Sequence, residues 1–321
     1  MALGMLIEGK WVKERDQEDT HGRFVRPSTT FRNSITADGS SGFKAEAGRY
    51  HLYVSWACPW AHRTAITRQL KGLEDAIGLS VVDPEMGEEG WAFSDFPGSI
   101  RDMVNGTQYL REVYLKAEPG FSGRVTVPVL WDKQTGTIVN NESREVMRML
   151  NKEFSDIAKR DFDLCPATLQ AEVDATIDAL YHPINNGVYR AGFATKQAAY
   201  EEAVTELFDA LDHWEGVLSQ QRFLCGNRLT EADICFFTTL LRFDVVYVTH
   251  FKCNLRRIVD YPNLWNYLKD IYQTPGVKEV CYLDHIKIHY YRSHPKVNPF
   301  GIVPKGPIIN FDEPHDRQKF S

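Results

Sequence analysis

The chain has 321 residues, enough for about two domains, and its 43% hydrophobic and 25% charged residues are typical of a globular protein. A formal net charge of −6 argues against a nucleic-acid partner, because contacts to the phosphate backbone require an excess of basic residues. No apolar run approaches the roughly 18 residues that span a bilayer, and the N-terminal segment meets Glu8 too early for a secretion signal. We therefore expect a cytoplasmic protein without a membrane partner, although an atypical import signal stays open.

The first half of the chain alternates strands and helices. Residues 1–47 are polar and without a clear period, which indicates an extension that lies over a domain. The segments that follow have β-branched and aromatic strand patterns or helical periodicity, and an insert separates the second strand from the third. In chain order they are a strand at 49–55, a helix at 56–71, a strand at 79–82, the insert at 83–123, strands at 125–131 and 137–139, and a helix at 143–151. This order predicts a thioredoxin-like α/β domain over residues 48–160.

The second half has the pattern of an all-helical domain, which we place at residues 161–321. Residues 167–179 and 196–218 are amphipathic with a period of 3.6, and a helix over 260–272 is entered through a proline. Thr230 and Asp233 have the spacing of a capping box. From Tyr290 onward the chain is rich in Pro and Gly, which indicates a C-terminal tail.

Six cysteines occur without a CxxC pair, so neither a zinc ribbon nor a disulfide scaffold is expected. Cys58 differs from the others because it follows a strand and precedes Pro59, and proline is favoured at the first position of a helix. As the N-cap, its sulfur would face the unpaired N–H groups of Trp60 and Ala61 and the positive end of the helix dipole. Both interactions favour the nucleophilic thiolate. The competing interpretation is a buried structural cysteine.

The position three residues after Cys58 is Ala61, where a dithiol oxidoreductase would have its second cysteine. A mixed disulfide at Cys58 therefore needs an external thiol to resolve it, and glutathione is the obvious cytosolic candidate.

Two further motifs fit a glutathione site. Val127-Pro128 is compatible with a cis bond that would turn the Val127 backbone toward a peptide-like ligand, although a trans edge proline is the alternative. Glu142 and Ser143 open a helix whose N-terminus could hold the carboxylate of a γ-glutamyl group, with Glu142 on its ammonium group. Taken alone, the second motif is an ordinary N-cap.

These features resemble the glutathione transferase superfamily. The run Ser55-Trp56-Ala57-Cys58-Pro59-Trp60-Ala61-His62-Arg63 is similar to one branch in particular, the glutathionyl-hydroquinone reductases or Xi-class glutathione transferases. The resemblance covers nearly the whole chain, including Phe24-Val25-Arg26 and Phe31-Arg32. It implies the glutathione transferase architecture, a thioredoxin-like N-terminal domain followed by an all-α C-terminal domain. We also expect a homodimer, whose geometry the sequence does not reveal.

The resemblance implies a role for each matching residue. Cys58 would be the nucleophile, and the glutathione contacts would be Trp91, Arg124, Val127, Glu142 and Ser143, of which Arg124 is matched only by its spacing. Catalytic tyrosines lining a second-substrate pocket would be Tyr189, Tyr247 and Tyr290. Without the family, Trp91 and the tyrosines would be interpreted as packing residues. The implied activity is glutathione-dependent reduction of glutathionyl-hydroquinones through a mixed disulfide on Cys58, with glutathione as co-substrate and without a metal.

Three other functions stay open. A general deglutathionylase or dehydroascorbate reductase would use the same Cys58 without a quinone pocket. A non-catalytic module would share only the fold. His285 and His289, spaced i,i+4, would fit a metal hydrolase, but no HExxH motif accompanies them.

Overall fold

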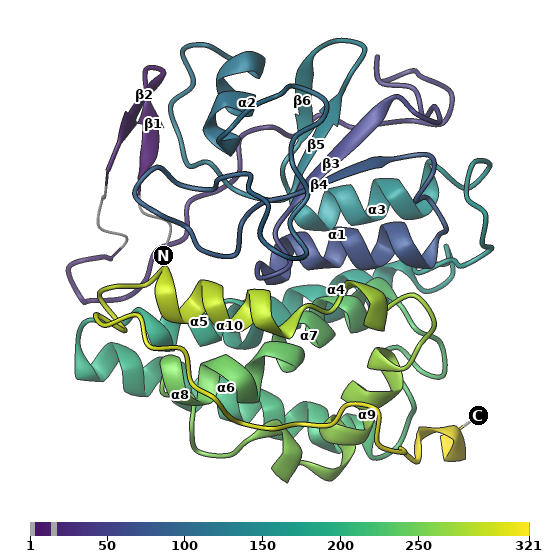
Figure 1. Ribbon diagram of the computed structural model, residues 1–321. Helices are drawn as coiled ribbons and strands as arrows, with labels where there is room; N and C mark the ends of the chain where they lie inside the picture. Colours follow the sequence, from purple (N-terminus) through teal and green to yellow (C-terminus); the bar gives the residue numbers. More distant parts are fainter. Residues whose placement is uncertain (1–3, 14–17, 321) are drawn as a thin grey trace.

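The computed structural model describes residues 4–13 and 18–320. Figure 1 shows a sheet with helices packed on it in one part of the molecule and a wholly helical part beside it. This arrangement confirms the predicted fold class, a thioredoxin-like α/β domain followed by an all-α domain.

The sheet is built around β3 (Tyr50–Val54), all of whose residues are buried. β4 (Gly78–Val81) pairs with it in parallel, and β5 (Val129–Asp132) pairs antiparallel on its other side, followed by β6 (Thr137–Asn140) at the edge. The strand order is therefore β4-β3-β5-β6. The third strand begins four residues later than predicted, because the cis bond Val127–Pro128 and the missing N–H of Pro128 keep this segment out of the ladder.

Helices α1 (Pro59–Leu70) and α3 (Ser143–Lys152) pack against each other beside the sheet, and α1 also contacts α7 of the helical part. α1 is buried along almost its whole length although it contains many polar residues. The Thr64 and Thr67 hydroxyls donate to the carbonyls of Ala61 and Arg63, so the helix satisfies part of its own buried polarity. A helix of this kind can lie between two domains instead of on a surface.

Through its described residues, the N-terminal extension contacts the sheet domain and, around residues 20–23, the helical part. Its hairpin, β1 (Met5–Ile7) and β2 (Lys10–Val12), joins the end of the insert through Leu6 and Gly123, and Asn33 donates its backbone N–H to Val139 of β6. The insert between β4 and β5 contains the helix α2 (Leu110–Ala117), which the sequence pattern did not indicate.

The helical part contains seven α-helices within the described residues. They are α4 (Gln170–Leu180), α5 (Gly187–Gly192), α6 (Gln197–Leu218), α7 (Glu231–Arg242), α8 (Val248–His250), α9 (Pro262–Tyr272) and α10 (Leu283–Arg292). Two π-helical turns, η1 (Tyr181–Asn185) and η2 (Phe243–Tyr247), and three 3₁₀ turns, η3 (Ile258–Asp260), η4 (Lys278–Val280) and η5 (Arg317–Phe320), complete it. The helices predicted around 167–179, 196–218 and 260–272 are present, whereas Tyr290, expected in the tail, belongs to α10.

The C-terminal tail runs across the helical part (Figure 1, yellow) and is tied to it. The buried Arg317 guanidinium donates to the carbonyl of Leu218, the last residue of α6, and to that of Arg222 in the segment after it. Phe311 is buried against Trp265 and Tyr272 of α9. The tail therefore closes one side of the helical core.

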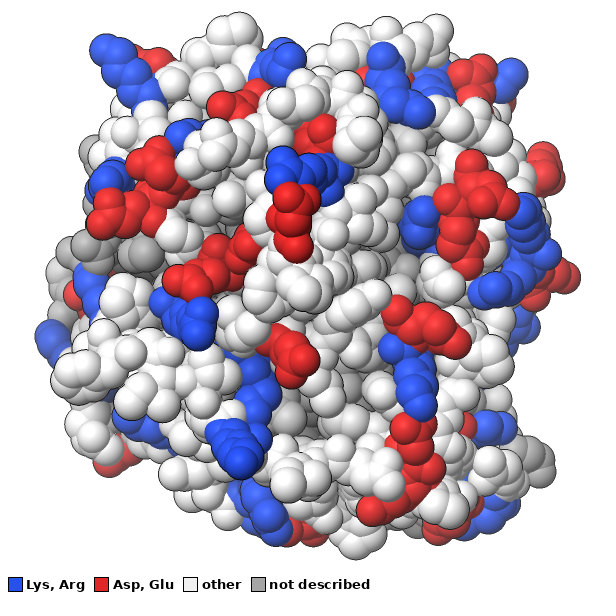
Figure 2. Space-filling view, in the orientation of Figure 1, with Lys and Arg blue, Asp and Glu red and all other residues white. Residues whose placement is uncertain are grey.

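The described residues include no helix that is long and apolar enough to cross a bilayer. On the face drawn in Figure 2, basic and acidic residues are interspersed and form no large patch of one sign. This distribution agrees with the small net charge of the chain.

The capping box at the start of α7 forms a buried polar cluster. Asp233 is fully buried and accepts hydrogen bonds from the Thr230 N–H (2.7 Å), the Leu224 N–H (2.8 Å) and the Tyr267 hydroxyl (2.9 Å). Burial raises the pKa of the Asp233 carboxyl to about 6.

We predict that Asp233→Ala lowers the free energy of unfolding by about 3–5 kcal/mol, because three buried donors lose their acceptor at once. Urea denaturation followed by circular dichroism measures this change. Asp209→Ala, at an exposed position of α6, is the matched control and should change stability by less than about 0.5 kcal/mol. A similar small change for Asp233→Ala would mean that the cluster does not support the helix.

Candidate active site

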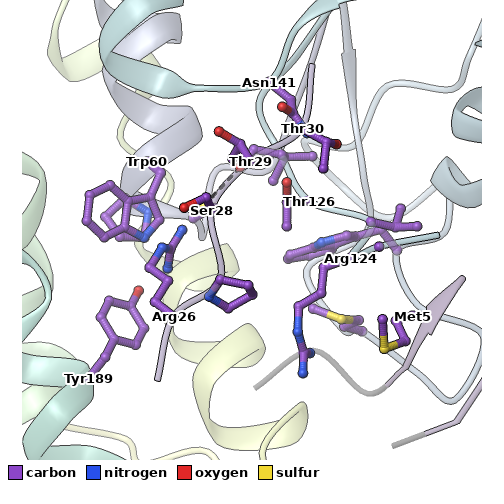
Figure 3. Close-up of a pocket in the computed structure, with 18 of the residues that line it drawn as sticks. Met5, Arg26, Ser28, Thr29, Thr30, Trp60, Arg124, Thr126, Asn141 and Tyr189 are labelled. Atoms are coloured by element: carbon purple, nitrogen blue, oxygen red, sulfur yellow. Dashed lines mark hydrogen bonds between the residues drawn. The ribbon is translucent and has the colours of Figure 1, made fainter. Parts of the chain in front are cut away.

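A cavity of about 630 Å³ lies between the sheet domain, the extension and the helical part. Its lining comes from segments far apart in the sequence: residues 25–30 of the extension, the start of α1, residues 122–127, and side chains of α5 and α10. Figure 3 shows the labelled residues of this lining converging from the sheet, the coil and the helices. The volume is in the range typical of small-molecule sites.

Cys58 opens into this cavity at the N-cap of α1, with Pro59 at the first helical position, as the sequence predicts. Its sulfur, however, makes no capping hydrogen bond to the N–H groups of Trp60 and Ala61. The thiol instead lies 3.7 Å from the backbone oxygen of Val127, to which it donates. The expected sulfur orientation is therefore wrong for the protonated thiol, because an S–H group needs an acceptor and the helix N-terminus offers only donors.

The other cysteines are poorly suited to chemistry. All six are free thiols, and four of them, Cys165, Cys225, Cys235 and Cys253, are buried. Burial raises the pKa of these four thiols and of Cys281, in the case of Cys165 to about 11. A raised pKa keeps the thiol in its unreactive form, so Cys58 is the candidate nucleophile.

The loop that carries Cys58 is held by a side chain of the helical part. Arg242, at the end of α7, is completely buried and donates to the carbonyl oxygens of Trp56 (2.8 Å) and Ala57 (2.9 Å). It also donates to Thr238 of its own helix and lies 3.3 Å from Nδ1 of His62 on α1. The two residues before Cys58 are thus fixed from the neighbouring domain.

Two of the three predicted tyrosines line the cavity. The hydroxyls of Tyr189 and Tyr290 are 2.5 Å apart, and the Tyr290 hydroxyl is 2.9 Å from that of Tyr247. Tyr247 does not line the cavity, contrary to expectation, because it is fully buried, and its hydroxyl is connected to the site through that of Tyr290. Burial raises the pKa of all three phenols, so they remain protonated hydrogen-bond donors.

Both π-helical turns lie next to these tyrosines. η1 precedes α5, which carries Tyr189, and η2 ends at Tyr247. Pro183 lies inside η1 and has no N–H to donate, which accounts for the irregular bonding there. π-helical turns change the direction of the side chains that follow them, and they occur often at functional sites.

The five predicted glutathione contacts fall into two groups. Trp91, Arg124 and Val127 line the cavity, and the Trp91 indole stacks on the His289 ring with centroids 4.8 Å apart. Glu142 and Ser143 do not line it, but the neighbouring Asn141 does. Glu142 is the N-cap of α3, as predicted, and accepts a hydrogen bond of 3.1 Å from the hydroxyl of Thr29, which lines the cavity.

The sequence patterns did not indicate several lining residues, notably Arg26, Trp60, His289 and His294. Trp60 follows Pro59 directly, so its position at the site could have been inferred from that of Cys58. Arg26 lies in a coil, and the histidines belong to or follow a helix, α10, that was not predicted. No local pattern places these residues near Cys58.

The two histidines that would fit a metal hydrolase each bond a backbone carbonyl of the insert. His285 bonds the carbonyl of Pro97 (2.7 Å) and His289 that of Pro84 (3.0 Å), both in the insert. Within residues 4–13 and 18–320, no cluster of three or more potential metal-binding side chains occurs. The two histidines attach α10 to the insert.

The site can be compared with proteins of known family. Models of the glutathione S-transferase N-terminal and C-terminal domains match residues 57–153 and 197–270. The glutathionyl-hydroquinone reductase YqjG of Escherichia coli is 53% identical over 98% of both chains. The chain belongs to the glutathione S-transferase family. The glutathionyl-hydroquinone reductase PcpF of Sphingobium chlorophenolicum is 50% identical over 95% of this chain and 96% of its own.

Solved Xi-class structures have the same fold. The Xi-class transferase of Natrialba magadii superposes with a TM-score of 0.95 at 55% identity, covering 99% of this chain and 98% of its own. The glutathione-bound structure of YqjG from Escherichia coli gives a TM-score of 0.91 at 52% identity, covering 98% and 99%. The similarity to the Xi class therefore extends over nearly the whole chain, including the extension and the insert.

We predict that Arg242→Lys lowers the free energy of unfolding by about 2–4 kcal/mol, because an ammonium group cannot reach all three carbonyls and leaves buried acceptors unpaired. Alkylation of Cys58 by iodoacetamide should also change in rate, since the loop before it is no longer fixed. Denaturant unfolding and mass spectrometry of the Cys58 peptide measure the two effects. Arg160→Lys, an exposed arginine that also donates to a carbonyl, should leave both unchanged; the same result for Arg242→Lys would contradict the anchoring role.

Proposed function

We propose that this protein reduces glutathionyl-hydroquinones to hydroquinones with glutathione as the reductant and Cys58 as the nucleophile. The observation that carries the proposal is that the Cys58 thiol faces a cavity whose wall holds two linked phenol hydroxyls, those of Tyr189 and Tyr290. The relatives named above as glutathionyl-hydroquinone reductases support it, as does the glutathione found in a homologous structure.

The glutathione moiety would occupy the side of the cavity formed by Trp91, Arg124 and Val127. The Val127 backbone supports this assignment, because its N–H donates no hydrogen bond to a described residue and its carbonyl already faces Cys58. A peptide-like ligand can pair with such a segment as an added strand would. Glu142 and Ser143, beside the cavity at the N-terminus of α3, would bind the γ-glutamyl end after displacement of the Thr29 hydroxyl.

In the first step, the Cys58 thiolate attacks the sulfur that joins glutathione to the aromatic ring. The new bond is the Cys58–glutathione disulfide, the bond that breaks is sulfur to ring carbon, and the ring carbon takes up a proton. Tyr189 and Tyr290 would donate hydrogen bonds to the ring oxygens, where negative charge develops as the ring leaves. Tyr247 would hold the Tyr290 hydroxyl in place.

In the second step, the thiolate of another glutathione attacks the mixed disulfide and releases glutathione disulfide and the Cys58 thiolate. The aromatic ring has gained two electrons, and the two glutathione sulfurs have lost them. Because the product of the first step leaves before the second glutathione reacts, ping-pong kinetics are expected. We further propose that the enzyme acts as a homodimer in the cytoplasm.

We predict that Cys58→Ser lowers turnover to less than about 1% of wild type, because a hydroxyl is a poor nucleophile toward sulfur. Turnover is measured as hydroquinone release from a glutathionyl-hydroquinone, and mass spectrometry should detect the glutathione adduct on wild-type Cys58 only. Cys281→Ser is the control, and it should keep both activity and the adduct. Substantial turnover by Cys58→Ser would assign the nucleophile elsewhere.

We predict that Tyr189→Phe and Tyr290→Phe slow reduction of glutathionyl-hydroquinones by about 10²-fold but spare reduction of a small glutathionyl mixed disulfide. A disulfide requires no hydrogen bond to its leaving group from a phenol, whereas an aromatic ring does. Tyr200→Phe, whose hydroxyl bonds Lys252 away from the cavity, is the matched control. Equal losses of activity on the two substrates would mean that the tyrosines serve only in packing. No loss on either substrate would favour a general deglutathionylase.

A further inference from the structure

Arg26 is a cation at the cavity wall that the proposed reaction does not use. It belongs to the extension, lines the cavity, and places its guanidinium carbon 4.4 Å from the centre of the Trp60 ring. No hydrogen bond or ion pair connects it to another residue in the part of the chain that the structure describes. Its N–H donors are therefore not satisfied by any described residue, and its guanidinium group stacks on the aromatic face of Trp60.

The aromatic face is itself held rigidly. Arg63 stacks on Trp60 at the same distance, 4.4 Å, and donates to Asn185 at 3.1 Å. Asn185 in turn donates to the Cys235 carbonyl and to the Thr239 hydroxyl of α7. Trp60 is thus stacked against two guanidinium groups, one anchored in the helical part and one pointing into the cavity.

The position of Arg26 distinguishes it from Arg124. In Figure 3, Arg26 points toward Trp60 and lies near Tyr189, whereas Arg124 lies on the other side of the labelled group, near Met5. Burial lowers the pKa of Arg124, and repulsion by the positive charge of Arg26 lowers it further. The two cations line the same cavity and are therefore close enough to interact electrostatically. The carboxylate of Glu18 also lines the cavity, but it accepts a hydrogen bond from the Thr195 hydroxyl.

We propose that Arg26 binds an anionic substituent of the aromatic leaving group, so that the preferred substrates are glutathionyl-hydroquinones whose ring bears a carboxylate. A guanidinium group with open donors matches a carboxylate through two parallel hydrogen bonds. Since Arg26 lies on the Tyr189 side, a ring oxygen on the phenol chain and a ring carboxylate on Arg26 can be held at the same time. This inference rests on the proposed function and specifies its substrate class.

The kinetic test compares two substrates, the glutathione conjugate of 2,5-dihydroxybenzoate and that of methylhydroquinone, in the wild-type enzyme, Arg26→Gln and Arg26→Lys. Wild type should show the higher kcat/KM on the carboxylate substrate. Arg26→Gln should lose roughly tenfold or more on that substrate and less than about twofold on the neutral one. Arg26→Lys should fall in between, because it keeps the charge but not the two-pronged geometry.

Arg23→Gln is the matched control, because Arg23 lies in the same extension but pairs with Glu202 and does not line the cavity. It should leave both kcat/KM values unchanged. Equal losses for Arg26→Gln on the two substrates, together with a higher half-saturation for glutathione, would assign Arg26 to glutathione and overturn the inference. Unchanged values on both substrates would overturn it as well.

A binding measurement separates this inference from the proposed function. Calorimetric titration of 2,5-dihydroxybenzoate and of unsubstituted hydroquinone requires no turnover. Wild type should bind the acid more tightly, and Arg26→Gln should remove the difference. If the enzyme reduced neither conjugate but still showed this Arg26-dependent preference, the proposed reaction would fail while the anion site would stand; equal binding of both compounds by wild type would reject the anion site.

Discussion

The arrangement of this active site depends on one buried guanidinium group. Arg242 carries a positive charge into the contact between the two domains, and the carbonyls of Trp56 and Ala57 supply two of its acceptors. A buried cation must be fully hydrogen-bonded, so the loop that presents Cys58 has little freedom relative to the helical part. Cys58 is followed by α1, and the loop before it is bonded to α7. Contacts in both domains therefore determine where the Cys58 sulfur lies.

The same contact contains further polar side chains of α1 that bond the helical part. His62 lies beside Arg242, and Arg63 reaches Asn185, which bonds two groups of α7. The bonds of His62 and Arg63 cross between α1 and the helical part, and those of Asn185 continue within the helical part. Because unsatisfied partners would be costly, the domains cannot slide without breaking several bonds together. Such rigidity suits a site in which a thiol from one domain must meet phenols from the other at a fixed distance.

The parts of the site that could be predicted are those encoded in a few consecutive residues. Cys58 before Pro59 gives an N-cap, and Val127-Pro128 has the cis bond that the sequence allowed. The strand order and the long helices follow from local periodicity in the same way. The direction predicted for the Cys58 thiol was wrong, because the thiol turns toward the Val127 carbonyl, which lies 69 residues further along the chain. Long-range contacts of this kind leave no local signal.

The unpredicted residues share one physical origin. Arg26 comes from a coil, and His289 comes from a helix, α10, that the sequence patterns did not indicate. None has a neighbour in the sequence that fixes its direction; the insert bonds His289, and Trp60 holds Arg26. The position of the nucleophile in the fold therefore follows from neighbouring residues in the sequence, whereas the arrangement of the residues that face the aromatic ring follows from tertiary packing. Changes in the extension or the insert can alter the choice of substrate while the geometry at Cys58 is kept, because the bonds that position the substrate-facing residues differ from those that position the Cys58 loop.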